Sequence, residues 1–203
     1  MSVETWAAFA IASAVLVAIP GPTVMLVLSY ALSRGRRVAV STALGVALGD
    51  LLAITACLLG LGALVAASAT AFTALKWIGA AYLVYLGIKL IRAPAAGLPD
   101  PGEARGTFRH AALVTALNPK GIAFFVAFVP QFIDPGRPVL PQAAIIVATF
   151  VAIGGLNALL YALAADALRA RIARPRVLSA LQKAGGATLI GMGALLALSR
   201  RTA

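Results

Sequence analysis

The chain has 203 residues, of which 62% are hydrophobic and 11% are charged, and it carries a formal net charge of +11. The hydrophobic share exceeds the roughly 45–50% apolar content of soluble domains, which excludes an ordinary soluble protein. The positive charge does not indicate nucleic-acid binding, because the basic residues lie between apolar runs, as in membrane proteins. We therefore predict an all-α integral membrane protein that forms one domain over residues 1–203.

The first apolar run, about Thr5–Leu32, contains the triplet Pro20-Gly21-Pro22. Each proline lacks the N–H that a helix needs, and its ring presses on the preceding turn. Apolar residues resume at once after the triplet, which indicates a broken membrane helix rather than the end of a span. Backbone groups freed at such a break are tolerated in a bilayer only where they are buried in protein or line a watery cavity.

Five further runs approach or exceed the roughly 20 residues that cross a bilayer. They cover about Val38–Ala66, Ala74–Ile91, Ala111–Phe132, Gln142–Ala165 and Leu181–Leu198. The fourth span carries a second break at Asn118-Pro119-Lys120. Between the spans we predict a short uncharged link at Ala67–Thr73, an irregular hydrophilic loop at Arg92–Arg109 and a basic connection at Arg169–Arg176.

The distribution of lysine and arginine near the span ends predicts the orientation, because cytoplasmic loops carry the excess of these residues. The richer side collects Arg34, Arg36, Arg37, Lys89, Arg92, Arg105, Arg109, Arg169, Arg171, Arg174, Arg176 and Lys183. The other side holds Lys76, Arg137, Arg200 and Arg201. The richer side is predicted to be cytoplasmic, which places both termini in the periplasm of a bacterium.

An internal repeat relates the two halves of the chain. Leu75–Gly87 aligns without gaps on Leu181–Gly193, and the two proline breaks fall at nearly the same offset. With three spans in each copy, the copies must cross the bilayer in opposite directions. We therefore predict two inverted three-helix repeats, residues 1–92 and 111–203, joined by a cytoplasmic loop at 93–110; many secondary transporters share this arrangement.

Asp50 is the strongest candidate for function, because it lies near the middle of the second span. A charge at that depth is costly and therefore indicates a functional site. It can carry a proton or bind a substrate amine, or it can be a protonated residue that joins two helices. Lys120 can extend toward the cytoplasm, neutralise Asp50 or meet a substrate carboxylate. Asn118 and Asn157 can join helices or contact substrate.

The breaks themselves supply groups that fit a zwitterion. Freed N–H groups after a break suit a carboxylate, and freed carbonyls before it suit an ammonium. No catalytic residue set, metal-ligand motif or phosphate-binding loop is present, so we expect no enzyme activity, no cofactor and no metal site.

The motifs together resemble the LysE/RhtB family of bacterial amino-acid exporters. They are Ile19-Pro20-Gly21-Pro22, Gly45 to Asp50, Lys76 through Tyr82 to Gly87, and Asn118-Pro119-Lys120 through Phe124-Phe125 to Phe132. The resemblance implies a six-span inner-membrane exporter of amino acids, driven by the proton gradient, and a possible homodimer. The family's motif positions map onto Pro20, Gly21, Pro22, Asp50, Asn118, Pro119 and Lys120.

We therefore expect a secondary transporter that exports amino acids or related zwitterionic metabolites by alternating access, with its site at the paired breaks. Asp50 is the expected proton carrier. Two alternatives are an exporter or channel for another solute, such as a metal cation, and a non-transport membrane scaffold or enzyme subunit. Carboxylates in the spans are too few for a dehydrated divalent-cation site.

Overall fold

A computed structural model describes residues 1–67, 69–93, 106–172 and 175–198, and all regular structure in these ranges is helical. The predicted all-α class is confirmed. The helices are α1 (Val3–Ala18), α2 (Pro22–Arg34), α3 (Ala39–Ala67), α4 (Ala69–Arg92), α5 (Thr107–Ala116), α6 (Pro119–Ala127), α7 (Val139–Ile172) and α8 (Pro175–Leu198), with 3₁₀ turns η1 (Gly35–Val38) and η2 (Val129–Phe132).

Both predicted helix breaks are present. The axes of α1 and α2 differ by 56°, and those of α5 and the α6–η2 segment differ by 45°. Ile19, Gly21 and Asn118 have extended backbones. Each of them precedes a proline, whose ring disfavours the helical conformation of the residue before it. Pro22 and Pro119 then begin α2 and α6, where the missing N–H costs nothing.

By length and composition, α3 and α7 can each cross a membrane, and the two bent pairs raise the number of candidate spans to four among the described residues. Several predicted boundaries were wrong. Residues 69–73 belong to α4 rather than to a link, because the segment has no helix breaker and is rich in alanine. Residues 107–109, predicted to end the loop, begin α5. Residues 94–105 of that loop lie outside the described part.

The predicted basic connection at 169–176 is also mostly helical. Helix α7 continues to Ile172 and α8 starts at Pro175, a residue that favours the first position of a helix. Residues 173–174 lie outside the described part, as do Arg200 and Arg201, which were counted in the predicted orientation. The connection is therefore shorter than its charge pattern suggested.

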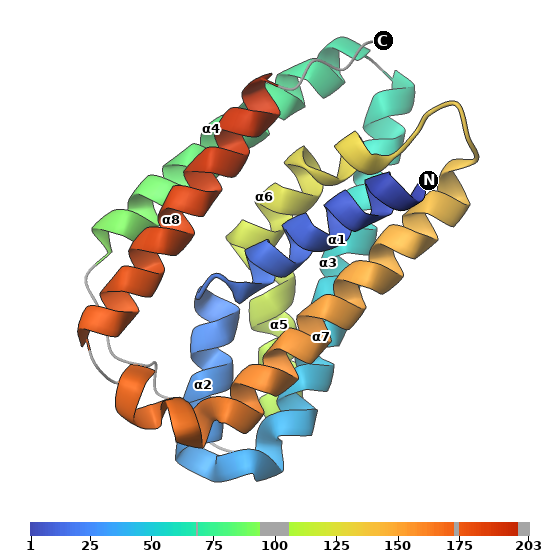
Figure 1. The fold of residues 1–203 in the computed structure, drawn as a ribbon. Coiled ribbons are helices and arrows are strands. Elements are labelled where there is room, and N and C mark those ends of the chain that lie inside the picture. Colours follow the sequence, from blue (N-terminus) through green and yellow to red (C-terminus); the bar gives the residue numbers. More distant parts are fainter. Residues whose placement is uncertain (68, 94–105, 173–174, 199–203) are drawn as a thin grey trace.

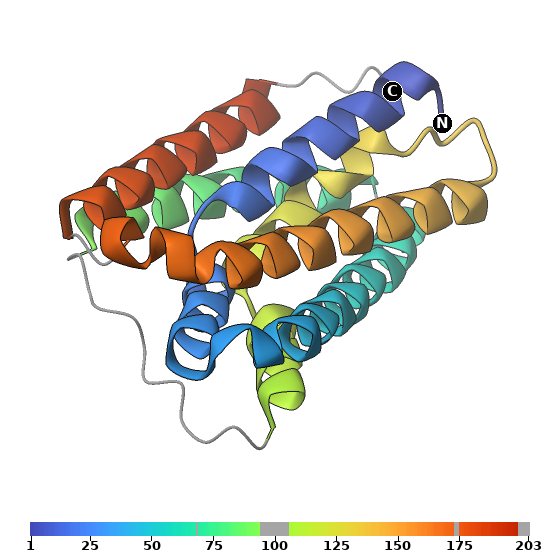
Figure 2. The ribbon, with the colours of Figure 1, turned by 60° about the horizontal axis from the view of Figure 1, so that its bottom comes forward.

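The same order of elements occurs twice: a bent pair, a long helix and a further helix. In Figure 1, α1–α2, α4 and α7 descend, whereas α3, α5–α6 and α8 ascend. Corresponding helices of the two halves therefore run in opposite directions. The start of α1 and the end of α8 lie toward the same end of the molecule (Figures 1 and 2).

Helices α4 and α8 lie side by side and antiparallel (Figure 1). A Cβ added to Gly87 would lie 2.5 Å from the carbonyl oxygen of Gly186, and one added to Gly193 would lie 2.7 Å from that of Ala80. Gly87 and Gly193 hold the same position in the aligned segments, and so do Ala80 and Gly186. When the two halves of the chain are interchanged, each of these close contacts therefore maps onto the other.

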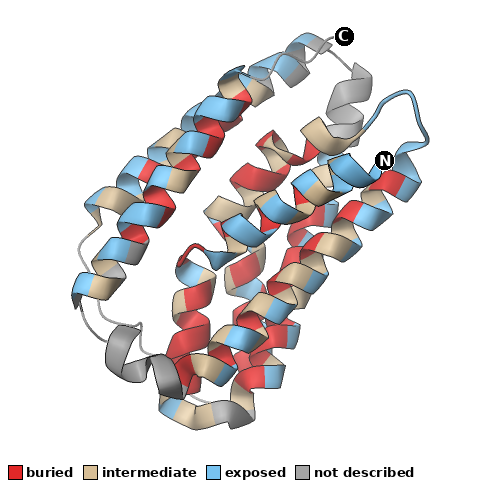
Figure 3. Ribbon diagram, in the orientation of Figure 1, coloured by how far each residue is buried: buried red, intermediate tan, exposed pale blue. Residues whose placement is uncertain are grey.

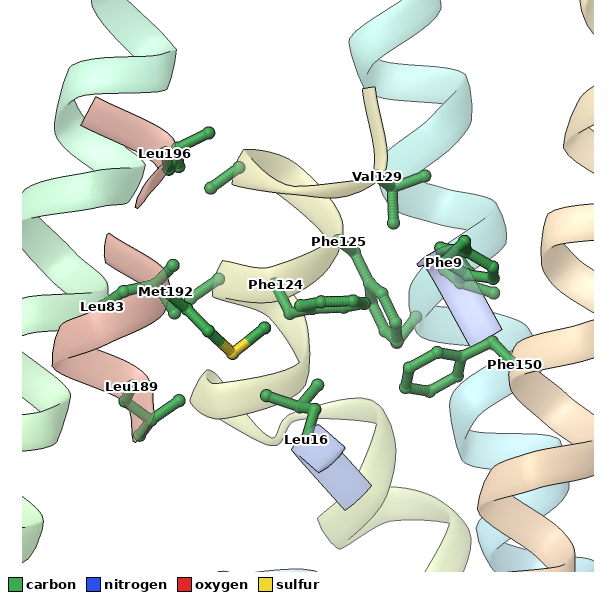
Figure 4. Packing of buried hydrophobic residues seen from close by; sticks show 14 of the residues in the cluster. Phe9, Leu16, Leu83, Phe124, Phe125, Val129, Phe150, Leu189, Met192 and Leu196 are labelled. Atoms are coloured by element: carbon green, nitrogen blue, oxygen red, sulfur yellow. The ribbon is translucent and has the colours of Figure 1, made fainter. Parts of the chain in front are cut away.

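The core consists of two hydrophobic clusters, and the breaks lie between them. One joins α1, α6 and α7 to α4 and α8 through residues such as Phe9, Phe124, Phe150 and Met192 (Figure 4). The other joins α2, α3, α5 and the second half of α7, with Tyr30 as its largest member.

Figure 3 shows buried residues on α2, α5 and α6 and exposed residues on the outer faces. Many exposed residues are large and apolar, including Ile11, Ile78 and Leu195, which suits a surface covered by lipid.

The close contact of α4 and α8 predicts that Gly186→Ala lowers the stability of the folded protein. Its methyl group would meet the Gly87 carbonyl, and overpacking of this kind costs about 1–3 kcal/mol. A methyl group added to Gly191 of the same helix would have no atom within 4 Å, so Gly191→Ala should be neutral or stabilise by up to about 1 kcal/mol. Thermal unfolding in detergent compares the two, and equal melting temperatures would contradict the contact.

Candidate functional site

Both helix breaks border one cavity of about 40 Å³, located where the two hydrophobic clusters meet. Its wall is mainly apolar. The polar side chains on it are Thr23, Asp50, Thr115, Asn118, Lys120, Asn157 and Tyr161. A cavity of this volume admits about three water molecules, so binding of a larger solute requires the cavity to open further.

The end of α1 is held by side chains from the other half of the chain. Lys120 at the start of α6 donates from its Nζ to the carbonyl oxygens of Leu16 and Ile19, over 2.9 and 2.7 Å. A helix C-terminus carries partial negative charge on its unpaired carbonyls, so an ammonium is a favourable partner there.

Two side chains of α7 complete this set. Asn157 donates from Nδ2 to the carbonyl of Val17 over 3.1 Å, and the Tyr161 hydroxyl donates to that of Ala18 over 3.0 Å. The carbonyls from Leu16 to Ile19 are therefore all hydrogen-bonded to α6 or α7. In this conformation the protein supplies its own donors to the carbonyls that the sequence predicts to suit a substrate ammonium.

The second break is joined to the first by a smaller polar group. Asn118 caps α6 by accepting from the Lys120 backbone N–H over 3.1 Å, and its Nδ2 donates to the Thr23 hydroxyl over 3.0 Å. The Thr23 and Thr115 hydroxyls lie 3.3 Å apart. The α5–α6 break is thus bound to the first turn of α2.

Asp50 lies on the cavity wall in α3 and is 7% exposed. It has no hydrogen bond or ion pair to any residue in the described part of the chain. A Cβ added to Gly154 of α7 would collide with Asp50 Oδ2, so this glycine provides the space for the carboxylate. Among the described residues that line the cavity, Asp50 is the only acidic one, and its oxygen atoms remain available as acceptors.

Lys120 neither extends toward the cytoplasm nor forms an ion pair with Asp50 in the described part of the chain; it binds the end of α1 instead. Pro20, Gly21, Pro22 and Pro119 are not on the cavity wall. They shape the breaks, and Gly21 lies against the lysine, since a Cβ there would be 3.5 Å from Lys120 Nζ.

Sequence reasoning missed Tyr161, Thr23 and Thr115. Tyr161 follows Asn157 by four residues and so lies on the same helix face, a signal that was available. Thr23 directly follows the first break, and Thr115 precedes Asn118 by three residues. Among the residues that the structure describes, no group of three or more His, Cys, Asp or Glu side chains could hold a metal ion.

The contact with the end of α1 predicts that Tyr161→Phe destabilises the protein, because the Ala18 carbonyl loses its donor. Ala18 is exposed at the protein surface, so the expected cost is that of one intramolecular hydrogen bond, about 0.5–1.5 kcal/mol. Tyr85 on α4 is 55% exposed, so Tyr85→Phe is the matched control and should not change the melting temperature. The hypothesis is wrong if both variants unfold at the same temperature.

The sequence is similar to those of known membrane proteins. The sequence model of the LysE type translocator family matches residues 14–200. A Vibrio cholerae protein described as an uncharacterized membrane protein is 37% identical over 98% of this chain and 100% of its own length. The homoserine/homoserine lactone efflux protein of Salmonella typhimurium is 37% identical over 98% of this chain and 99% of its own length, and its Salmonella typhi counterpart is 36% identical.

No solved structure matches the chain significantly. The family match covers most of the residues and both helix breaks, and the relatives align over nearly their full lengths. The chain is therefore a membrane translocator rather than an enzyme, and it belongs to the LysE type translocator family.

Proposed function

We propose that the protein exports amino acids and related small amines, homoserine and homoserine lactone among them, across the bacterial inner membrane. The observation that carries this proposal is the meeting of the two helix breaks at one cavity, where Asp50 is the only carboxylate among the described lining residues. Relatives that align over nearly the whole chain are named for homoserine and homoserine lactone efflux.

The chemistry of these two compounds indicates what the site recognises. Homoserine carries an ammonium and a carboxylate, whereas its lactone keeps the amine but has no free carboxylate. A site that accepts both must therefore bind the ammonium. The cavity offers acceptors for it, namely the Asp50 carboxylate and the carbonyls at the end of α1.

We infer that the protein crosses the membrane six times, as two inverted three-helix repeats. Helices α4 and α8 have 24 residues each, which at about 1.5 Å per residue is enough to cross the hydrocarbon core. The opposite directions of corresponding helices and the exchanged glycine contacts of α4 and α8 support the repeat. Alternating access then follows as a movement of one repeat against the other around the cavity.

The orientation that we propose has both termini in the periplasm. Basic residues lie at the ends of α2, α4 and α5 that are remote from the start of α1 (Figure 1), namely Arg34, Lys89, Arg92 and Arg109. Lys183 lies in the first half of α8, which begins at that same end. Clusters of basic residues remain in the cytoplasm.

Asp50 is the proposed proton carrier. It is buried, borders the cavity and has no ion-pair partner in the described part of the chain. A carboxyl group at this depth can hold a proton during the return of the empty carrier and release it when substrate binds. Export driven by the inward proton gradient then needs no other energy source.

The proposed substrate class predicts the outcome of a transport panel in proteoliposomes. Labelled homoserine should exchange with unlabelled homoserine and homoserine lactone, and it should not exchange with 4-hydroxybutyrate, which keeps the hydroxyl and carboxylate and lacks the amine. Empty liposomes provide the background. Absence of homoserine flux would refute the substrate assignment, and flux of cadmium or manganese ions instead would favour a cation exporter.

The role of Asp50 predicts that Asp50→Asn abolishes transport driven by a pH gradient while the protein stays folded, because an amide cannot carry the proton. Asp134→Asn is the control, since Asp134 lies in an exposed loop and pairs with Arg137; this variant should retain gradient-driven transport. Rates of gradient-driven transport equal to the wild type in Asp50→Asn would remove Asp50 from the coupling mechanism.

A further inference from the structure

We propose that the Lys120 ammonium occupies the place where the substrate ammonium binds, and that substrate must displace it to be exported. This inference rests on the proposed function. It identifies the carbonyls of Leu16 and Ile19 as the binding site of the substrate ammonium. Lys120 therefore determines both the affinity for amines and the return of the empty carrier.

The groups that bind the Lys120 ammonium can bind any primary ammonium. Lys120 Nζ donates to two backbone carbonyls, of Leu16 and Ile19, at the negative end of α1. A primary ammonium has three N–H donors, and any primary alkyl ammonium presents the same group. A pair of carbonyls that binds the lysine side chain through this group can also bind the ammonium of an amino acid.

The cavity wall carries two side chains of opposite charge. Lys120 and Asp50 line the same wall, yet no ion pair joins them in the described part of the chain. Opposite charges attract strongly at low dielectric, so Lys120 has a second partner within the cavity. The lysine can therefore leave the carbonyls without becoming an unpaired charge.

The cavity is too small to hold the Lys120 side chain and a substrate together. The cavity of about 40 Å³ admits about three waters and does not admit an amino acid beside the lysine. Among the side chains on its wall, Lys120 has the longest flexible stem. Its displacement would clear both the carbonyls and the space that the stem occupies.

Displacement of Lys120 couples substrate binding to proton release. Substrate enters, its ammonium binds the carbonyls of Leu16 and Ile19, and Lys120 turns to Asp50. The lysine ammonium then replaces a proton as the counter-charge of Asp50, and the proton leaves to water. After substrate is released, Lys120 returns to the carbonyls and Asp50 takes up a proton. The empty carrier therefore returns with its α1 carbonyls hydrogen-bonded and with Asp50 protonated. One proton is carried inward for each substrate molecule exported.

The test compares Lys120→Met with Lys89→Met in proteoliposomes, with labelled homoserine as the probe. Lys89 is an exposed residue of α4, and it serves as the matched control. Without the competing lysine ammonium, Lys120→Met should exchange homoserine with a half-saturation concentration about tenfold lower than that of the wild type. This factor corresponds to an ammonium site that is unoccupied by Lys120 about one tenth of the time in the wild type. Net export into substrate-free medium should be lost, because the Ile19 carbonyl loses its donor in the empty carrier, whereas the Leu16 carbonyl keeps the Ile19 N–H. Lys89→Met should match the wild type in both assays.

Lys120→Arg provides a second variant with the opposite expectation. A guanidinium holds several N–H donors in a rigid fork and stays charged, so it can occupy both carbonyls more firmly. Its half-saturation concentration for exchange should rise by about tenfold. This variant keeps the hydrogen bonds of the folded protein and therefore tests the inference even if Lys120→Met does not fold.

A third arm separates hydrogen bonding from charge alone. The N-trimethyl derivative of homoserine keeps the positive charge but has no N–H to donate, and it should not exchange with labelled homoserine.

Equal loss of exchange and net export in a folded Lys120→Met variant, unchanged half-saturation in both Lys120 variants, or exchange of the trimethyl derivative would overturn the inference while the proposed function stands. A wild type that moves no homoserine would overturn the proposed function and this inference with it.

Discussion

The structure depends on one constraint, which is the pairing of the backbone groups exposed where α1 ends inside the protein. A break inside a membrane helix leaves carbonyls without helical partners, and the bilayer offers none. Here Lys120, Asn157 and Tyr161 supply the donors. The first half of the chain therefore cannot keep its broken helix without the second half packed against it.

The same pairing explains why the two halves carry different residues at corresponding places. The first break is a Pro-Gly-Pro triplet, which exposes carbonyls and contributes no side-chain donor, and the second is Asn-Pro-Lys, which contributes both a cap and a cation. Asn118 satisfies its own helix and contacts Thr23, while Lys120 crosses to α1. At the breaks, the first repeat thus provides hydrogen-bond acceptors and the second repeat provides donors.

Small residues carry the rest of the architecture. Gly154 leaves room for the Asp50 carboxylate between α3 and α7, and Gly87 and Gly186 let α4 and α8 approach at backbone distance. Close helix contacts of this kind are a principal source of association between helices in lipid, where apolar side chains gain little by leaving the solvent. Gly154 therefore matters both for helix packing and for the proposed function, because a larger residue there would displace the buried Asp50 carboxylate.

The sequence by itself determined the membrane class, both helix breaks, the order of the helices and the family, because proline geometry and the length of apolar runs act locally. It also identified Asp50, Asn118, Lys120 and Asn157, because polar residues are rare in such runs. It misplaced several helix ends, since alanine-rich and basic segments are compatible with both helix and loop. Only the tertiary structure decided the partners: Lys120 and Leu16 are 104 residues apart in the chain. Which donor reaches which carbonyl depends on how the halves pack, and no local pattern records that.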